Sequence, residues 1–211
     1  DRRVSGAVDT VVFDVGHVLV DTDYGPWLAL LAEHGAEFAS MDAFCDAVDL
    51  DAHEAGAVDA EAFLWRVQSQ VRRPIPRLRL LHEWNAMYRP VAPLVAAARR
   101  LRRTHRVYVL SNMGEVHWPH LVGLLDLAAI SHDALASYMV GCMKPAPAIY
   151  AHAEQRFALV PERTVFVDDR PDNVAAAQAR GWHALRHVSP ARTLGDLARS
   201  GLPVHDSATG G

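Results

Sequence analysis

Four groups of polar residues follow or interrupt short apolar segments, and their types suit chemistry on an anionic molecule. The first is an aspartate inside an apolar run, where an ionised carboxylate is costly to bury unless it is paired or binds a metal. The residues are Asp14 in TVVFDVGHVLV, Ser111 and Asn112 in VYVLSN, Lys144 in GCMKPAPAIY, and Asp168 and Asp169 in TVFVDD.

Together these groups combine three carboxylates, one ammonium and one hydroxyl. Clustered carboxylates repel one another unless a cation lies among them, and a set of oxygen ligands near a phosphate suits Mg²⁺. The ammonium and the hydroxyl can hold the oxygens of an anionic substrate. Lys144 is the only lysine among 21 basic residues, which indicates a position where a guanidinium cannot replace a compact ammonium.

Short β segments alternate with helical periodicity, which predicts an α/β fold with a mostly parallel sheet. The ligand-binding edge of such a sheet is formed by the carboxyl ends of its strands, so we expect the polar groups to meet there. The predicted strands are Thr10–Val15, Arg106–Ser111, Ala134–Ser137, Thr164–Asp168 and His183–His187. The predicted helices between them are Val91–Arg103, His117–Leu125, Ala146–Phe157 and Asn173–Arg180.

A long insertion, about residues 24–90, separates the first two predicted strands and has helical periodicity throughout. It is too long for a simple connection between a strand and a helix. We therefore expect a core of residues 1–23 and 91–211 and a small inserted helical domain of residues 24–90. Its predicted helices are Pro26–His34, Met41–Val48, Ala60–Val71 and Pro76–Tyr88.

The composition is that of an ordinary globular protein, with 50% hydrophobic and 22% charged residues. A net charge of −4 argues against nucleic acid or an anionic membrane as a partner. The sequence contains no apolar run of the roughly 18 residues that a membrane span needs, and no signal peptide is expected. Two cysteines form no disulfide framework, so we expect a cytoplasmic protein, as a monomer or a weak dimer.

The four motifs resemble, in order and spacing, those of the haloacid dehalogenase (HAD) superfamily, over roughly residues 8–190. The resemblance implies a Rossmann-like three-layer core, an inserted C1-type helical cap, and Mg²⁺-dependent hydrolysis of a small phosphorylated metabolite. It also implies a nucleophile that forms a covalent aspartyl intermediate, and Asp14 stands at that position.

The resemblance assigns further roles residue by residue. Ser111 and the adjacent Asn112 amide would hold the phosphoryl oxygens, and Lys144 would neutralise both the nucleophile and the phosphoryl group. The metal ligands would be Asp14, the backbone carbonyl of Gly16, Asp169 directly, and Asp168 directly or through water.

Gly16 departs from the pattern of most phosphatases of the superfamily, which have there a second aspartate that protonates the leaving group. A bacterial branch with the same D-x-G form, which includes α-glucose-1-phosphate phosphatases, resembles this chain through the insertion as well. A sugar 1-phosphate needs the least help from an acid, because the ring oxygen makes the anomeric oxygen a better leaving group. His17 and Asp21 are two nearby residues that could replace the acid.

Further substrate contacts are expected from His53 and Glu54 in the insertion and from His117 in the loop after Ser111. Each has an alternative, purely structural role. Two other functions stay open at this point. One is a binding or regulatory protein with weakened catalysis, which the glycine at position 16 favours. The other is a metal-independent haloacid dehalogenase, which would leave Asp168 and Asp169 without a role.

Overall fold

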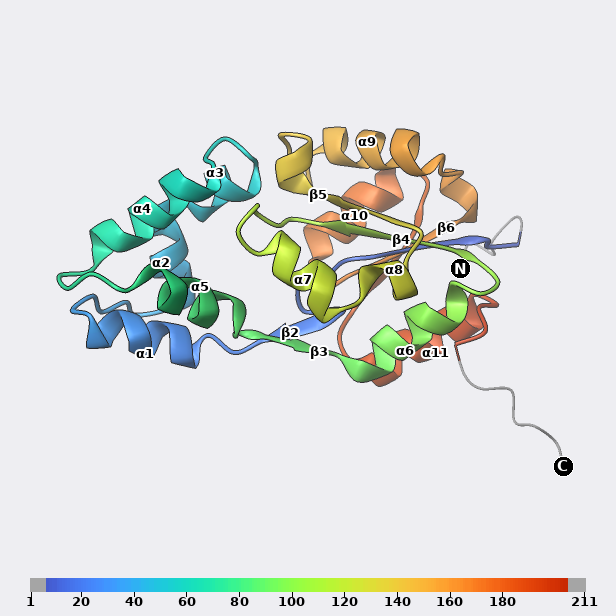
Figure 1. The fold of residues 1–211 in the computed structure, drawn as a ribbon. Coiled ribbons are helices and arrows are strands. Elements are labelled where there is room, and N and C mark those ends of the chain that lie inside the picture. Colours follow the sequence, from blue (N-terminus) through green and yellow to red (C-terminus); the bar gives the residue numbers. More distant parts are fainter. Residues whose placement is uncertain (1–6, 205–211) are drawn as a thin grey trace, which may run out of the picture.

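The structure, a computed structural model, describes residues 7–204. Its central sheet has five parallel strands in the order β5–β4–β1–β6–β7. The first strand of the chain is therefore the middle strand, and its carboxyl end lies between those of β4 and β6 (Figure 1). The strands are β1 (Thr10–Phe13), β4 (Arg106–Ser111), β5 (Asp133–Ala136), β6 (Thr164–Asp168) and β7 (His183–Arg186).

Successive residues of the sheet point to opposite faces and pack against different helices. Val11 and Phe13 belong to a hydrophobic cluster with α6, α7, α8 and α11, whereas Val12 belongs to a cluster with α9 and α10. Full burial of each such side chain contributes roughly 1.5–3 kcal/mol relative to exposure. The core is thus a three-layer α/β structure, which confirms the predicted fold class. Its helices are α6 (Ala92–Leu101), α7 (Trp118–Leu124), α8 (Leu127–Ile130), α9 (Pro147–Phe157), α10 (Pro171–Ala179) and α11 (Pro190–Arg199).

Five helices of the insertion surround a third hydrophobic cluster of their own at one end of the sheet (Figure 1). Its centre is aromatic: the ring centroids of Trp27 and Trp84 are 4.6 Å apart, and those of Phe63 and Trp84 are 5.5 Å apart. We propose that this unit is the cap of residues 24–90. Its helices are α1 (Gly25–Glu33), α2 (Met41–Val48), α3 (Leu50–Glu54), α4 (Ala60–Gln70) and α5 (Arg77–Asn85).

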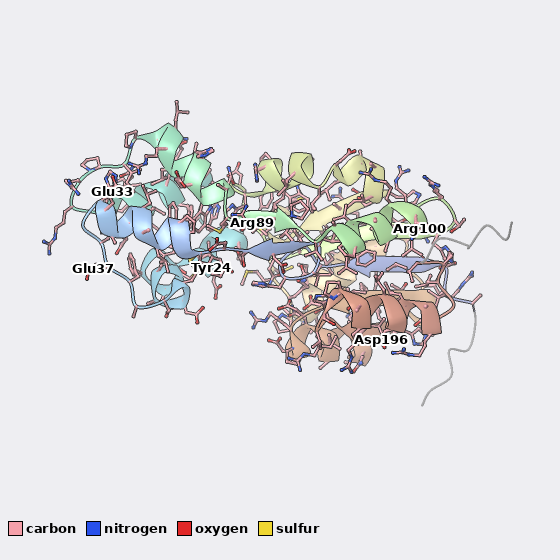
Figure 2. The ribbon with its side chains drawn as sticks, turned by 90° about the horizontal axis from the view of Figure 1, so that it is seen from below. Tyr24, Glu33, Glu37, Arg89, Arg100 and Asp196 are labelled. Carbon is pink, nitrogen blue, oxygen red and sulfur yellow. The ribbon has the colours of Figure 1, made fainter. Side chains whose placement is uncertain are left out.

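The chain enters and leaves this helical unit through an antiparallel ribbon of β2 (Val20–Thr22) and β3 (Tyr88–Pro90). Figure 2 shows Arg89, a residue of this ribbon, and Tyr24, which follows β2, between the helical unit and the sheet. The prediction that the insertion is helical throughout is therefore wrong at its end, because the helix predicted up to Tyr88 stops at Asn85. A three-residue strand depends on its distant partner rather than on a local pattern, and the pattern did not indicate it.

The α3 helix lies against the core and is fixed there by close contacts. The hydroxyl of Ser137, in the 3-10 turn Ser137–Met139, donates to the carbonyl of Glu54 at 2.5 Å and accepts from the amide of Met113 at 3.0 Å. Gly56 lies so close to the core that a Cβ there would be 2.5 Å from the carbonyl oxygen of Tyr138. The end of α3 is thereby held over the carboxyl ends of β4 and β5.

No helix within residues 7–204 combines the length and the apolar character that crossing a membrane requires.

Candidate active site

A cavity of about 390 Å³ lies where the carboxyl ends of β1, β4 and β6 meet the end of α3. Both parts of the molecule contribute to its wall. The insertion contributes Tyr24, Asp51 and Glu54, and the core contributes the predicted site residues Asp14, Gly16, Ser111, Asn112, Lys144 and Asp169. The structure thus brings most of the predicted site residues to one place.

Lys144 is the centre of a buried charge network on the core side of this cavity. Its ammonium nitrogen lies 2.9 Å from Asp14 Oδ1, 2.6 Å from Asp168 Oδ2 and 3.0 Å from the carbonyl oxygen of Leu110. Burial by itself would lower the pKa of Lys144, but the two carboxylates outweigh it and raise the pKa. The ammonium therefore stays charged, with each of its three protons directed at one acceptor.

Asp168 is fully buried behind the cavity wall and is held from several sides. Its Oδ1 accepts from the amide of Arg170 at 2.9 Å and from Asn173 Nδ2 at 3.0 Å, while its Oδ2 accepts from Lys144. Asn173 lies in the first turn of α10 and is itself buried. These bonds fix the position of the Asp168 carboxylate.

Asp14, Asp168 and Asp169 form a cluster in which one carboxylate oxygen of each lies within 4.8 Å of the others. The desolvation of Asp14 raises its pKa to about 7, and the charges of Asp168 and Asp169 add to this, while Lys144 opposes it. A divalent cation removes such repulsion, and hard oxygen ligands are those that Mg²⁺ prefers. The donor set therefore fits Mg²⁺.

Asp14 presents one oxygen to the protein and leaves the other available. Its Oδ1 accepts from the amide of Val15 at 2.7 Å and from Lys144, which fixes the orientation of the carboxylate. Among residues 7–204, none donates to Oδ2. An oriented carboxylate with a free oxygen at a cavity wall is suited to nucleophilic attack or to metal binding.

Ser111, the last residue of β4, and Asn112, which follows it, lie on the other side of Asp14 from Asp168 and differ in how they are bound. The Ser111 hydroxyl is buried and has no hydrogen-bond partner among the described residues, which is costly unless a ligand supplies one. The Asn112 side chain instead donates to the Lys144 carbonyl and accepts from the Lys144 amide, both at 2.8 Å. The Asn112 side chain thus positions the segment that carries Lys144.

Gly16 lines the cavity, and a Cβ placed on it would contact nothing within 4 Å. Sterics therefore do not explain why this residue is a glycine. His17 also lines the cavity, but its Nε2 lies 3.5 Å from the Thr22 hydroxyl and 3.4 Å from the Tyr24 hydroxyl. Asp21 is an exposed residue of β2 and is not part of the cavity wall.

The other predicted substrate contacts have different outcomes. Glu54 lines the cavity, whereas His53 and His117 do not, so the structure does not support substrate contact by these two histidines. The His53 ring stacks on Phe63 and its Nδ1 lies 2.9 Å from the Val58 carbonyl oxygen. The His117 ring stacks on Trp84, and burial lowers its pKa well below the ordinary value. Both rings pack in the interior as neutral aromatic side chains.

Sequence reasoning missed three cavity residues that carry charge or a hydroxyl, namely Tyr24, Asp51 and Arg170. A signal existed for Asp51, which stands three residues before Glu54 and therefore shares a helix face with it. Arg170 directly follows the acidic pair at the end of β6. Tyr24 carried no such signal, because the ribbon that positions it was not predicted.

Comparison with known proteins gives the family. The model of the family described as haloacid dehalogenase-like hydrolase matches residues 8–181. One relative is a D-ribitol-5-phosphate phosphatase of Bacteroides thetaiotaomicron, which is 22% identical over 192 residues, spanning 85% of this chain and 91% of that protein.

Similar solved structures support the same fold. A HAD family enzyme of Bacteroides thetaiotaomicron, in complex with magnesium and inorganic phosphate, has a TM-score of 0.78 at 20% identity, covering 86% of this chain and 95% of that one. A predicted HAD-like family hydrolase of Porphyromonas gingivalis has a TM-score of 0.74 at 22% identity, covering 92% and 99%. With the family model matching most of its length, the chain belongs to the haloacid dehalogenase-like hydrolase family.

Proposed function

We propose that this hydrolase is a Mg²⁺-dependent phosphatase that cleaves small phosphomonoesters through an aspartyl-phosphate intermediate on Asp14. One observation carries the proposal: a single cavity joins an oriented carboxylate with a free oxygen, a buried ammonium and an unpartnered hydroxyl, and two of the three clustered carboxylates line it. The name of the ribitol-phosphate phosphatase that the chain resembles supports it.

In the first step, Asp14 Oδ2 attacks the phosphorus and the bond to the leaving oxygen breaks. Lys144 holds Asp14 Oδ1 and neutralises charge beside the transferred group, and the Ser111 hydroxyl donates to a phosphoryl oxygen. Fixed donors of this kind stabilise charge that develops in the transition state. Water then attacks the phosphorus and releases phosphate, which regenerates the Asp14 carboxylate.

The metal would be held by Asp14, Asp168 and Asp169, with the backbone carbonyl of Gly16 as a further oxygen ligand. Bound there, Mg²⁺ would neutralise charge on the phosphoryl oxygens. The Bacteroides enzyme crystallised with magnesium and inorganic phosphate supports this assignment.

The substrate class is a sugar or polyol monophosphate. The cavity of about 390 Å³ has the size of a small-molecule site, and the carboxyl groups of Asp51 and Glu54 are suited to hydrogen bonds with hydroxyl groups. A sugar 1-phosphate is the first substrate to test, because Gly16 supplies no acid and the anomeric oxygen needs the least protonation.

Phosphate release from a panel of glucose 1-phosphate, glucose 6-phosphate, ribitol 5-phosphate and an aryl phosphate, with and without Mg²⁺, tests the proposal. We expect Mg²⁺-dependent turnover in the wild type and a loss of at least about 10³-fold in Asp14→Asn, because the amide keeps the shape and removes the nucleophile. A variant that keeps more than a few per cent of wild-type activity would show that Asp14 is not the nucleophile.

Two further assays separate the other two functions. A binding or regulatory protein would bind a phosphate ester without releasing phosphate, which equilibrium binding by calorimetry would detect. A dehalogenase would release halide from a 2-haloacid, and chelation of divalent ions would not change that rate.

A further inference from the structure

The charge network on the core side of the cavity offers no acid for the leaving group, although it supplies the nucleophile. Gly16 has no side chain, and Asp168 and Lys144 are engaged with each other. Asp14 and Asp169 belong to the carboxylate cluster that suits the metal. An ordinary alkoxide is a poor leaving group, so a phosphatase without a proton donor would be restricted to activated esters.

Four residues of the cavity wall outside the core network could carry a proton, namely His17, Tyr24, Asp51 and Glu54. The first two face each other, since the His17 ring nitrogen lies 3.4 Å from the Tyr24 hydroxyl. Burial raises the pKa of Tyr24 above its ordinary value, which makes it a weaker acid. Asp51 is exposed to solvent, whereas Glu54 is half-buried.

Glu54 combines a fixed backbone with a carboxyl group that has no partner. Its carbonyl accepts from Ser137, and the neighbouring His53 packs its ring against Gly114 of the core, where a Cβ would come within 2.2 Å. Among residues 7–204, the Glu54 carboxyl forms no hydrogen bond and no ion pair. The core therefore holds the end of α3 so that this free carboxyl group faces the cavity.

The surroundings of Glu54 keep a proton on it at neutral pH. Burial raises the pKa of Glu54 to about 8, the charges of Asp51 and Asp14 add to this, and Lys144 and Arg170 oppose it. The charged or titratable groups that share the cavity are Asp14, His17, Tyr24, Asp51, Lys144, Asp169 and Arg170. A dianionic phosphate ester bound beside them would favour the protonated carboxyl, and Mg²⁺ bound at the carboxylate cluster would oppose this effect.

We propose that Glu54 protonates the leaving oxygen and so replaces the acid that Gly16 lacks. The inference rests on the proposed phosphatase function. When Asp14 bonds to phosphorus and the ester bond breaks, the Glu54 proton moves to the leaving oxygen and the alcohol departs. The Glu54 carboxylate then takes a proton from the water that attacks the phosphorus, the bond from phosphorus to Asp14 breaks, and phosphate leaves.

This role changes the expected substrate range. With Glu54 as the acid, the wild type hydrolyses alkyl phosphates such as sugar or polyol 5- and 6-phosphates, and not only activated esters. The preference for 1-phosphates that Gly16 favours should then emerge only when Glu54 is replaced.

The test compares Glu54→Gln with the wild type in the presence of Mg²⁺. It uses 2,4-dinitrophenyl phosphate, whose leaving group needs no proton, and the alkyl phosphate that the wild type hydrolyses fastest. The measured quantity is kcat/KM, which reports the steps up to departure of the leaving group. We expect Glu54→Gln to lose about 10²- to 10⁴-fold on the alkyl ester and less than about threefold on the aryl ester.

Two further measurements separate an acid from a structural contact. The wild-type kcat/KM for the alkyl ester should fall as the pH rises through about 8, because deprotonated Glu54 cannot donate, and this fall should be absent in Glu54→Gln. A Cβ on Gly16 would meet nothing within 4 Å, so there is room for a side chain at this position. Adding Gly16→Asp to the Glu54→Gln variant should therefore restore hydrolysis of the alkyl ester. The matched Asp51→Asn variant removes a substrate contact but not the acid, so it should keep the fall of kcat/KM with rising pH for the alkyl ester.

If Glu54→Gln lowers kcat/KM equally for both esters, the role of Glu54 is overturned. A wild type that hydrolyses the aryl ester but no alkyl phosphate would overturn it as well. In either case, Mg²⁺-dependent hydrolysis of the aryl ester would leave the proposed phosphatase function intact. A wild type that hydrolyses neither ester would instead overturn the phosphatase function itself.

Discussion

The two sides of the cavity are built in opposite ways. On the core side the central charges are held by one another: Lys144 directs its three protons at Asp14, Asp168 and the Leu110 carbonyl, and Asp168 accepts from four donor contacts. On the other side, the carboxyl groups of Asp51 and Glu54 have no hydrogen-bond or ion-pair partner among the described residues.

The difference matches what each side has to bind. A phosphoryl group has one shape and charge in every substrate, so a rigid and preorganised set of groups stabilises its transfer best. The leaving group varies between substrates, and side chains without internal partners can form hydrogen bonds with different hydroxyl patterns. We infer that the core side determines the reaction and the α3 side determines the substrate.

The largest effect is expected when the core network loses its cation. Lys144→Ala leaves Asp14 and Asp168 buried without their partner, which should lower the free energy of unfolding by about 3–5 kcal/mol. Lys144→Arg should be nearly as inactive as Lys144→Ala, with losses above about 10²-fold in kcat, because a planar guanidinium cannot direct three donors at these three acceptors. Denaturant unfolding and steady-state kinetics measure the two effects.

Metal binding provides a control for the Lys144 variants. Mg²⁺ should raise the Tm of Lys144→Ala more than that of the wild type, because the cation then compensates a cluster that has lost its ammonium. An active Lys144→Arg variant would contradict the network as described, since any positive charge would then be sufficient.

A smaller effect is expected when Ser111 is replaced, and the replacement should act in opposite directions on stability and on activity. Its buried hydroxyl has no partner, and such a group costs about 1–3 kcal/mol. Ser111→Ala should therefore keep the free energy of unfolding or raise it by about 1 kcal/mol, while kcat/KM falls by roughly 10- to 10²-fold as one donor to the phosphoryl oxygens is lost. A destabilised variant with unchanged kcat/KM would assign Ser111 to the fold rather than to the reaction.

The core side could be predicted from the sequence more completely than the α3 side, and the reason is physical. Asp14, Ser111 and Asp168 are placed by β1, β4 and β6, whose apolar runs are local signals, and parallel strands bring their carboxyl ends together. The orientation of Glu54 depends instead on Ser137 and on the approach of Gly56 to Tyr138, contacts between residues far apart in the chain.

Two histidines illustrate the same limit. His53 and His117 stand near the site in sequence, yet their rings stack on Phe63 and Trp84. A sequence pattern does not distinguish a buried aromatic histidine from one that faces a ligand.

The α11 helix was missed for another reason, because local signals for it are present in the sequence. Ser189 caps the helix by accepting from the Arg192 amide, and Pro190 follows it.

The smallest effect is expected where the two sides touch. A Cβ on Gly114 would lie 2.2 Å from His53 Cδ2, so Gly114→Ala forces the His53 ring and the end of α3 away from the core. We expect overpacking to lower the free energy of unfolding by about 1–3 kcal/mol. We also expect a decrease of only several-fold in kcat/KM, confined to the substrates whose leaving groups contact the α3 side.

Gly123→Ala is the matched control, because Gly123 lies in α7 with nothing within 4 Å of an added Cβ, and alanine there should stabilise the helix by about 0.5–1 kcal/mol. Rates on an aryl phosphate and on the best alkyl phosphate, measured beside thermal unfolding for both variants, check the pair. If Gly114→Ala slows the hydrolysis of both esters equally, the contact between α3 and the core also positions the phosphoryl group. That result would contradict the inference that the core side determines the reaction and the α3 side determines the substrate.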